Sequence, residues 1–98
     1  MQVIATKITQ NPAIVKFELD EIIVRTENFE FKNIDETQNS PLAKQLFFLP
    51  FVKTVYISGN FIAIEKFSIV EWEDVQEDVA NQINEFISNG GVIIQVDE

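Results

Sequence analysis

The carboxylates between positions 71 and 78 are the first place to look for chemistry in this chain. They are Glu71, Glu73, Asp74, Glu77 and Asp78. On a helix, Asp74 lies one turn before Asp78, and Glu73 lies one turn before Glu77, so each pair shares a face. Such pairs can hold a hard cation or work as a general acid and base. Acids in the first turns of a helix are also stabilised by the helix dipole, and the spacing favours this second explanation.

The segment from residue 40 to 47 is the other distinctive motif, and its pattern predicts a capped amphipathic helix. The Ser40 hydroxyl can accept a hydrogen bond from an amide of the first turn, and Pro41 suits the first helical position. Apolar residues at 42, 43, 46 and 47 would pack on the core, which leaves Lys44 and Gln45 outside, available to a partner. Ser40 is not expected to act as a nucleophile, because the chain has no histidine to activate it.

The composition excludes several kinds of site. The 98 residues include no cysteine and no histidine, which removes disulfides, thiolate zinc sites, cysteine-ligated iron–sulfur clusters and histidine-held haem. Ser–His and Cys–His nucleophile pairs are excluded for the same reason. An enzyme that uses carboxylates alone remains a hypothesis that we rank last, because no two acids are forced to face one another across a cleft. We therefore expect no enzyme, and no catalytic, cofactor-binding or metal-binding residue.

The charge is unevenly placed along the chain. The 16 acids and 7 bases give a net charge of −9, yet every base lies before residue 67 and residues 67–98 carry acids only. An acidic surface repels phosphate groups, so neither a nucleic acid nor a membrane is expected as a partner. The chain also lacks an apolar stretch of about 18 residues and a signal-peptide core, so the expected compartment is the cytoplasm.

Hydrophobic patterning predicts one domain over residues 1–98, built mainly from strands. The alternation of Val15, Phe17 and Leu19 with charged residues is typical of a half-buried antiparallel strand. A tight turn after it is expected to bring Ile22 and Val24 into the same pattern. A turn is also predicted at Asn11-Pro12, and residues 33–39 are predicted to be a polar loop. Strands are predicted around residues 2–8, 15–19, 29–31, 51–57, 61–67 and 92–96.

A second helix is predicted to begin near Trp72 and to end at Asn89-Gly90-Gly91, where Gly90 can adopt the left-handed conformation. Its apolar positions form one helical stripe: Trp72, Val75, Val79, Ile83 and Phe86. Strands segregated from two helices indicate an α+β fold, with a single mainly antiparallel sheet and both helices packed on one face.

Four of these segments together resemble a known family. Residues 11–17, Asn-Pro-Ala-Ile-Val-Lys-Phe, are similar to the first motif of the N-terminal domain of Nfu/NifU proteins. Residues 40–47, Ser-Pro-Leu-Ala-Lys-Gln-Leu-Phe, look like the signature helix of that domain. The hairpin at residues 52–64 and the pair Glu71-Trp72 match its later elements in order, so the resemblance covers nearly the whole chain.

The resemblance implies a role in iron–sulfur cluster assembly, where Nfu-type proteins are scaffolds or carriers. In that family, a separate C-terminal domain holds the cluster through a Cys-x-x-Cys pair from each of two subunits. This chain looks like the N-terminal domain without that cluster-binding domain, so no cofactor is expected in it. We therefore expect a non-catalytic accessory domain that interacts with iron–sulfur assembly or recipient proteins.

The partner surface predicted at this stage consists of Asn11, Pro12, Ser40, Lys44 and Gln45. The alternative hypothesis is a stand-alone protein- or peptide-binding module, in which an exposed strand edge accepts an extended segment. Outward lysines at positions 16, 32 and 53 would instead guard such an edge against pairing.

Overall fold

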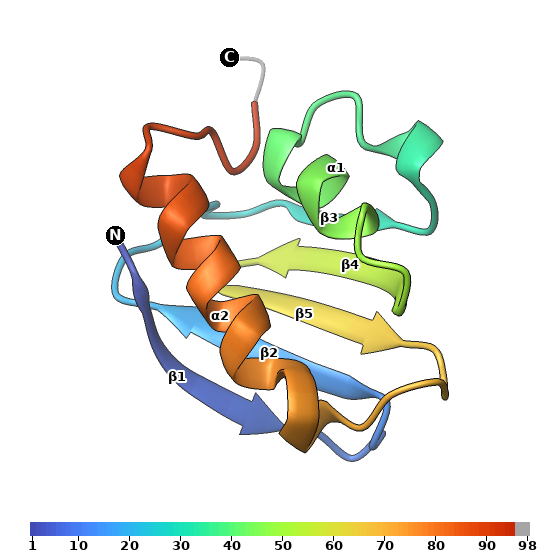
Figure 1. Ribbon diagram of the computed structural model, residues 1–98. Helices are drawn as coiled ribbons and strands as arrows, with labels where there is room; N and C mark the ends of the chain where they lie inside the picture. The colour runs from blue at the N-terminus through green and yellow to red at the C-terminus, as the bar shows by residue number, and fades with distance from the viewer. Residues whose placement is uncertain (96–98) are drawn as a thin grey trace.

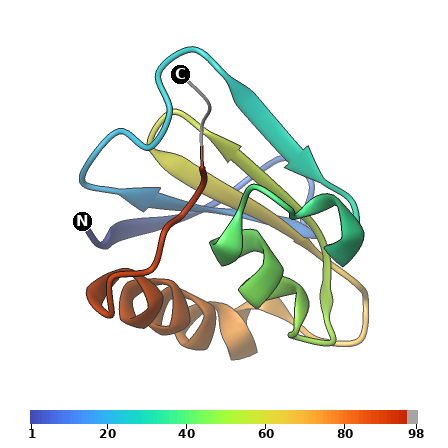
Figure 2. The same ribbon diagram turned by 90° about the horizontal axis from the view of Figure 1, so that it is seen from above.

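Five strands form one antiparallel sheet in the computed structural model, which describes residues 1–95. Both helices cover the same face of this sheet (Figures 1 and 2). The order across the sheet is β1-β2-β5-β4-β3, so β1 and β3 are its two edges. The predicted α+β class and the arrangement of both helices on one face are therefore confirmed. The elements are β1 (Val3–Ile8), β2 (Ile14–Leu19), β3 (Asn28–Phe31), a short 3₁₀ turn η1 (Ile34–Glu36), α1 (Pro41–Phe47), β4 (Val52–Ser58), β5 (Phe61–Lys66) and α2 (Trp72–Ser88).

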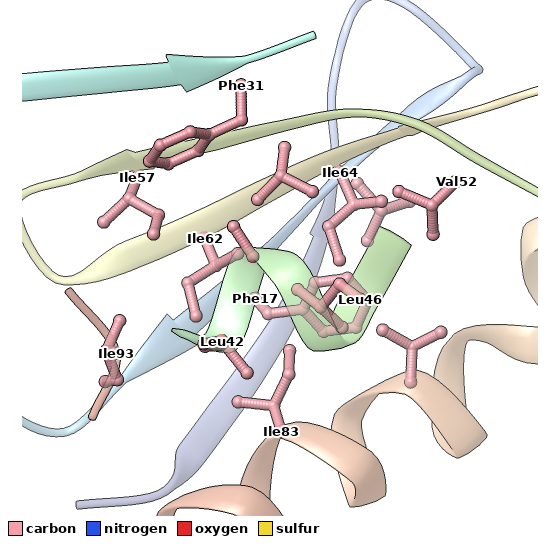
Figure 3. Packing of buried hydrophobic residues seen from close by; sticks show 14 of the residues in the cluster. Phe17, Phe31, Leu42, Leu46, Val52, Ile57, Ile62, Ile64, Ile83 and Ile93 are labelled. Atoms are coloured by element: carbon pink, nitrogen blue, oxygen red, sulfur yellow. The ribbon is translucent and has the colours of Figure 1, made fainter. Parts of the chain in front are cut away.

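The core lies between the sheet and the two helices. Alternate residues of the central strands point into it, and Phe17, Ile62 and Ile64 are fully buried. Figure 3 shows side chains from both helices, including Leu46 of α1 and Ile83 of α2, meeting these strand residues. Full burial of one such side chain contributes about 1.5–3 kcal/mol, so this shared cluster holds the two layers together.

Helix α1 begins as its sequence predicts. The Ser40 hydroxyl accepts a hydrogen bond from the Ala43 amide at 3.1 Å, and Pro41 occupies the first helical position. Leu42, Ala43 and Leu46 are buried against the sheet, which confirms the predicted apolar face.

Helix α2 also follows its predicted stripe, because Trp72, Val79 and Ile83 are buried. The Trp72 ring contacts Phe17 edge-on, with ring centroids 5.8 Å apart, and its Nε1 donates to the Ala13 carbonyl at 2.7 Å. The helix ends at Ser88, and Gly90 has the expected left-handed conformation with φ of 84°.

The expectation that Ile22 and Val24 continue the strand pattern is wrong. Residues 20–27 form no strand, because β1 and β5 already pair with the two sides of β2 and leave no free edge there. Val24 is nevertheless buried, and its amide donates to the Gly59 carbonyl at 3.2 Å. Val24 therefore covers the end of the β4–β5 hairpin, whereas Ile22 is 63% exposed.

The strand predicted at residues 92–96 is also absent over residues 92–95, and Val96 lies outside the described residues. This segment docks on the start of α1 instead of joining the sheet. The Gln95 amide donates to the Asn39 carbonyl at 2.6 Å, and the Ser40 hydroxyl donates to the Ile93 carbonyl at 2.6 Å. Ile93 is buried, and Figure 3 shows it beside Leu42.

The predicted polar loop at residues 33–39 contains the short 3₁₀ turn η1. Thr37 follows this turn and is buried, and its hydroxyl donates to the Ile34 carbonyl at 2.6 Å. Its buried hydroxyl has a partner within the loop and needs none elsewhere.

Candidate functional site

Ser40 does not belong to the surface on which the sequence placed it. The residue is fully buried, and its hydroxyl is occupied twice, as an acceptor from Ala43 and as a donor to Ile93. Its place in the predicted partner surface is therefore wrong. A residue that caps α1 and anchors the segment after α2 cannot also contact a partner.

Lys44 and Gln45 are exposed as predicted, but they lie on different sides of α1. Gln45 lines a hollow between α1 and the C-terminal half of α2. Lys44 lines another hollow, which η1 and Pro41 border on the opposite side of the helix. Neighbouring residues on a helix point about 100° apart, so these two side chains serve separate surfaces.

The turn at Asn11 and Pro12 is exposed and lies apart from α1. The Asn11 side chain accepts from the Ala13 amide at 2.9 Å, which closes the turn locally. The Ala13 carbonyl accepts from Trp72, so this turn adjoins the start of α2. Figure 1 shows the turn at the β1–β2 side of the sheet and α1 over β4. The structure thus does not unite the predicted residues into one surface.

A groove between α1 and α2 is the first of two surfaces that the fold creates. Its volume is about 620 Å³, and we call it the interhelical groove. Its lining is mainly carboxylates and side-chain amides, joined by one aromatic ring and one glycine: Gln45, Asp78, Asn81, Gln82, Glu85, Phe86, Asn89 and Gly91. The sequence pattern pointed to Asp78 but not to Glu85, and it did not indicate that α1 forms the opposite wall. Only the packing of both helices on one sheet decides that neighbourhood.

The face of the sheet opposite the helices is the second surface. Tyr56 and Phe61 pack together there with ring centroids 6.1 Å apart, and the Lys16 Nζ lies 4.5 Å from the Phe61 centroid. These side chains border a hollow of about 360 Å³ around Ala63. The sequence analysis did not predict this surface. A signal was available, because a two-residue hairpin turn at Gly59 pairs Tyr56 with Ala63 and so places these two side chains next to each other on one face.

The strand order also changes the role proposed for three lysines. Lys16 belongs to β2 and Lys53 to β4, and both strands lie inside the sheet. The two residues therefore cannot guard a sheet edge. Lys32 directly follows the edge strand β3, so the edge-guarding hypothesis still applies to it. Its Nζ lies 3.9 Å from a Glu30 carboxylate oxygen.

The acids of α2 do not form a metal centre in the described part of the chain. Over residues 1–95, no three His, Cys, Asp or Glu side chains are grouped in a way that could hold a metal ion. An iron–sulfur cluster does not fit the donor set either, because the chain has no cysteine and no histidine. The same residues include no helix with the length and apolar character needed to span a membrane.

Comparison with known proteins gives a consistent match. Residues 4–90 match the family model described as scaffold protein Nfu/NifU N terminal. The chain is 32% identical over 88 residues to the mitochondrial NFU1 iron-sulfur cluster scaffold homolog of Drosophila willistoni, covering 89% of this chain and 30% of that protein. It is 31% identical to the human homolog, with 89% and 35% covered. The chain therefore spans about a third of the length of these relatives.

Solved structures share the same fold. The solution structure of a NifU-like protein from Saccharomyces cerevisiae superposes with a TM-score of 0.81 at 24% identity, covering 98% of this chain and 87% of that one. The crystal structure of a Staphylococcus aureus protein gives 0.72 at 22% identity, covering 85% and 99%. These structures show the fold alone, whereas the match of residues 4–90 to the family model shows that the chain belongs to the Nfu/NifU scaffold protein family, as its N-terminal domain.

Proposed function

We propose that this domain is a non-catalytic docking module in iron–sulfur cluster assembly and that it does not itself hold the cluster. The proposal rests on which side chains the chain offers as metal ligands. Protein-bound iron–sulfur clusters need thiolates or imidazoles, and neither side chain occurs in the 98 residues. A fold without these ligands still offers two extended surfaces on which a partner can dock.

The relatives support the context in which this docking would occur. The matched proteins are named iron-sulfur cluster scaffold homologs, and they are about three times as long as this chain. We infer that residues 1–98 act as one domain and that a cluster-binding domain with the Cys-x-x-Cys pair, absent from them, supplies the ligands. The partners would be iron–sulfur assembly proteins or the recipients of their clusters. We keep the cytoplasm as the proposed compartment, although the named relatives are mitochondrial.

Anaerobic reconstitution tests whether the domain holds a cluster. The purified chain would be incubated with ferrous iron and sulfide and then desalted. We expect no visible cluster absorption and no retained iron. A scaffold domain with a Cys-x-x-Cys pair, treated in the same way, serves as the positive control. Iron retained by this chain in a fixed ratio to protein would contradict the proposal.

Direct binding measurements test the docking role. Purified cluster scaffolds and apo recipient proteins would be passed over the immobilised chain, with an unrelated acidic protein as the control surface. We expect saturable binding to at least one of these proteins and none to the control. Failure of every scaffold and recipient to bind would exclude docking as the function of this domain.

A second candidate function is a peptide-binding module, and one structural observation favours it. The edge strand β1 pairs only with β2, and its side chains include Ile4 and Ile8, which are 59% and 85% exposed. An extended peptide can add a strand to such an edge through main-chain hydrogen bonds. Amide shift changes concentrated on β1 during titration with extended apolar peptides would support this candidate over the first.

A further inference from the structure

We propose that the interhelical groove is the docking site for a basic amphipathic helix of a partner protein. The inference rests on the docking function proposed above and specifies both the surface and the chemistry of the partner. Three properties of the groove support it: its shape, the position of its charges and the absence of internal compensation for them.

The shape of the groove fits a helix. Its α2 wall follows the helical period from Asp78 through Glu85 to Asn89. These eleven steps span about 16 Å, or three turns, at 1.5 Å per residue. Gln45 of α1 stands on the opposite wall, and the partly buried Phe86 adds an apolar contact. Helices that bind in the hydrophobic grooves of other proteins do so through a few apolar anchor residues. In this mostly polar groove, Phe86 can receive such an anchor.

The position of the charges calls for an explanation other than the helix dipole. Glu73 and Asp74 lie in the first turn of α2, where the dipole stabilises an anion. Asp78 lies in the middle of the helix, and Glu85 lies close to its C-terminal end, where the dipole disfavours an anion. No basic residue lies in that last turn. The dipole therefore accounts for Glu73 and Asp74, but not for Asp78 and Glu85, which line the groove. Glu77 lies outside the groove, and the dipole does not account for it either.

The chain does not neutralise the groove from within. The ion pairs of residues 1–95 use Glu18, Glu21, Glu30 and Glu65, none of which lies on α2. No base occurs after residue 66, and Lys44 faces the other side of α1. The described residues therefore supply no base to pair with these exposed carboxylates, and a basic partner would complement them. Because Asp78 and Glu85 are seven residues apart on one face, the matching helix carries two bases at the same spacing.

A synthetic helix provides the probe for a binding experiment. An alanine-rich peptide with two lysines seven positions apart and a leucine between them would be titrated into the ¹⁵N-labelled chain. We expect saturable amide shift changes at residues 45, 78–91 and few elsewhere. A peptide with glutamate in place of both lysines is the control and is expected not to bind.

Two double variants separate the groove from the overall charge. Asp78→Asn with Glu85→Gln removes two charges from the groove, whereas Glu73→Gln with Glu77→Gln removes two exposed charges from the same helix outside it. We expect the groove variant to weaken peptide binding about tenfold, because it removes two exposed ion pairs with the peptide lysines. The matched control variant is expected to weaken peptide binding less than about twofold, because its two charges do not contact the peptide.

Equal losses in the two variants would overturn the inference, because they would indicate attraction to net charge alone. Shift changes on the sheet, or no saturable binding, would overturn it as well. None of these three results would contradict the docking function. That function fails only if the scaffold and recipient proteins named under the proposed function do not bind this chain.

Discussion

Ser40 joins two parts of the molecule, the start of α1 and the segment after α2, through a single hydroxyl. It caps α1 by accepting from the Ala43 amide, and it donates to the Ile93 carbonyl in the segment that follows α2. The residue is fully buried, so both hydrogen bonds form away from water. Removing one partner of such a hydrogen bond leaves a buried polar group unsatisfied, and the full desolvation cost of that group then lowers the stability of the fold. Ser40 is therefore more important than an ordinary cap.

Replacing Ser40 with alanine is expected to lower the free energy of unfolding by about 2 kcal/mol. The lost cap accounts for about 1 kcal/mol, and the unsatisfied Ile93 carbonyl for a similar amount. Chemical denaturation followed by Trp72 fluorescence measures the change, since the chain has one tryptophan. The control is Ser88→Ala, where an exposed hydroxyl donates to the Glu85 carbonyl. A loss as small as in that control would contradict the double role of Ser40.

At the scale of the element, α2 combines acids that the helix dipole favours with acids that it disfavours. Glu73 lies in the first turn, while Glu85 lies near the end of a helix whose last turn has no base. We expect Glu73→Gln to lower the free energy of unfolding and Glu85→Gln to raise it, each by about 0.5 kcal/mol. Thermal unfolding at low salt measures both. Effects of the same sign would show that net repulsion, and not the dipole, dominates on this helix.

The segment after α2 is a second element whose packing can be tested. Ile93 is buried against α1, whereas the neighbouring Val92 is 45% exposed. Ile93→Ala is expected to cost about 2–3 kcal/mol, because it leaves a cavity beside α1. Val92→Ala is the matched control and is expected to cost less than about 0.5 kcal/mol. Equal costs in denaturant titrations would argue against the docking of this segment on α1.

The whole molecule carries its charge unevenly between its layers. The central strands pair lysines with glutamates, as in the contact of 3.8 Å between Lys53 and Glu65, whereas α2 bears acids without bases. The ion pairs of the described residues all involve partly or largely exposed side chains, so each contributes little. We therefore expect repulsion within a net charge of −9 to outweigh the attraction of these pairs.

Salt is accordingly expected to stabilise the domain. Raising NaCl from about 10 mM to about 200 mM shortens the screening length from about 30 Å to below 10 Å and weakens the repulsion. We expect the melting temperature to rise by a few degrees, and to rise less in the Asp78→Asn, Glu85→Gln variant. A melting temperature that falls with salt would mean that the ion pairs dominate.

The sequence alone determined the elements whose signals are local. The alternation in β2, the cap and apolar face of α1, the stripe of α2 and the left-handed Gly90 were all predicted, because each depends on residues a few positions apart. The sequence likewise determined that these 98 residues offer no thiolate or imidazole ligand, which is the basis of the proposal that the domain does not hold the cluster.

Tertiary structure decided which surfaces these elements form. Ile22 and Val24 have a strand-like pattern, but β2 had no free edge to pair with them. The sequence pattern placed Ser40 on the surface as a helix cap, but in the fold the distant Ile93 lies against it and accepts a hydrogen bond from its hydroxyl. Gln45 and Glu85 are forty positions apart, and they share a groove only because both helices pack on one face of the sheet. Such neighbourhoods depend on long-range packing, which no local pattern encodes.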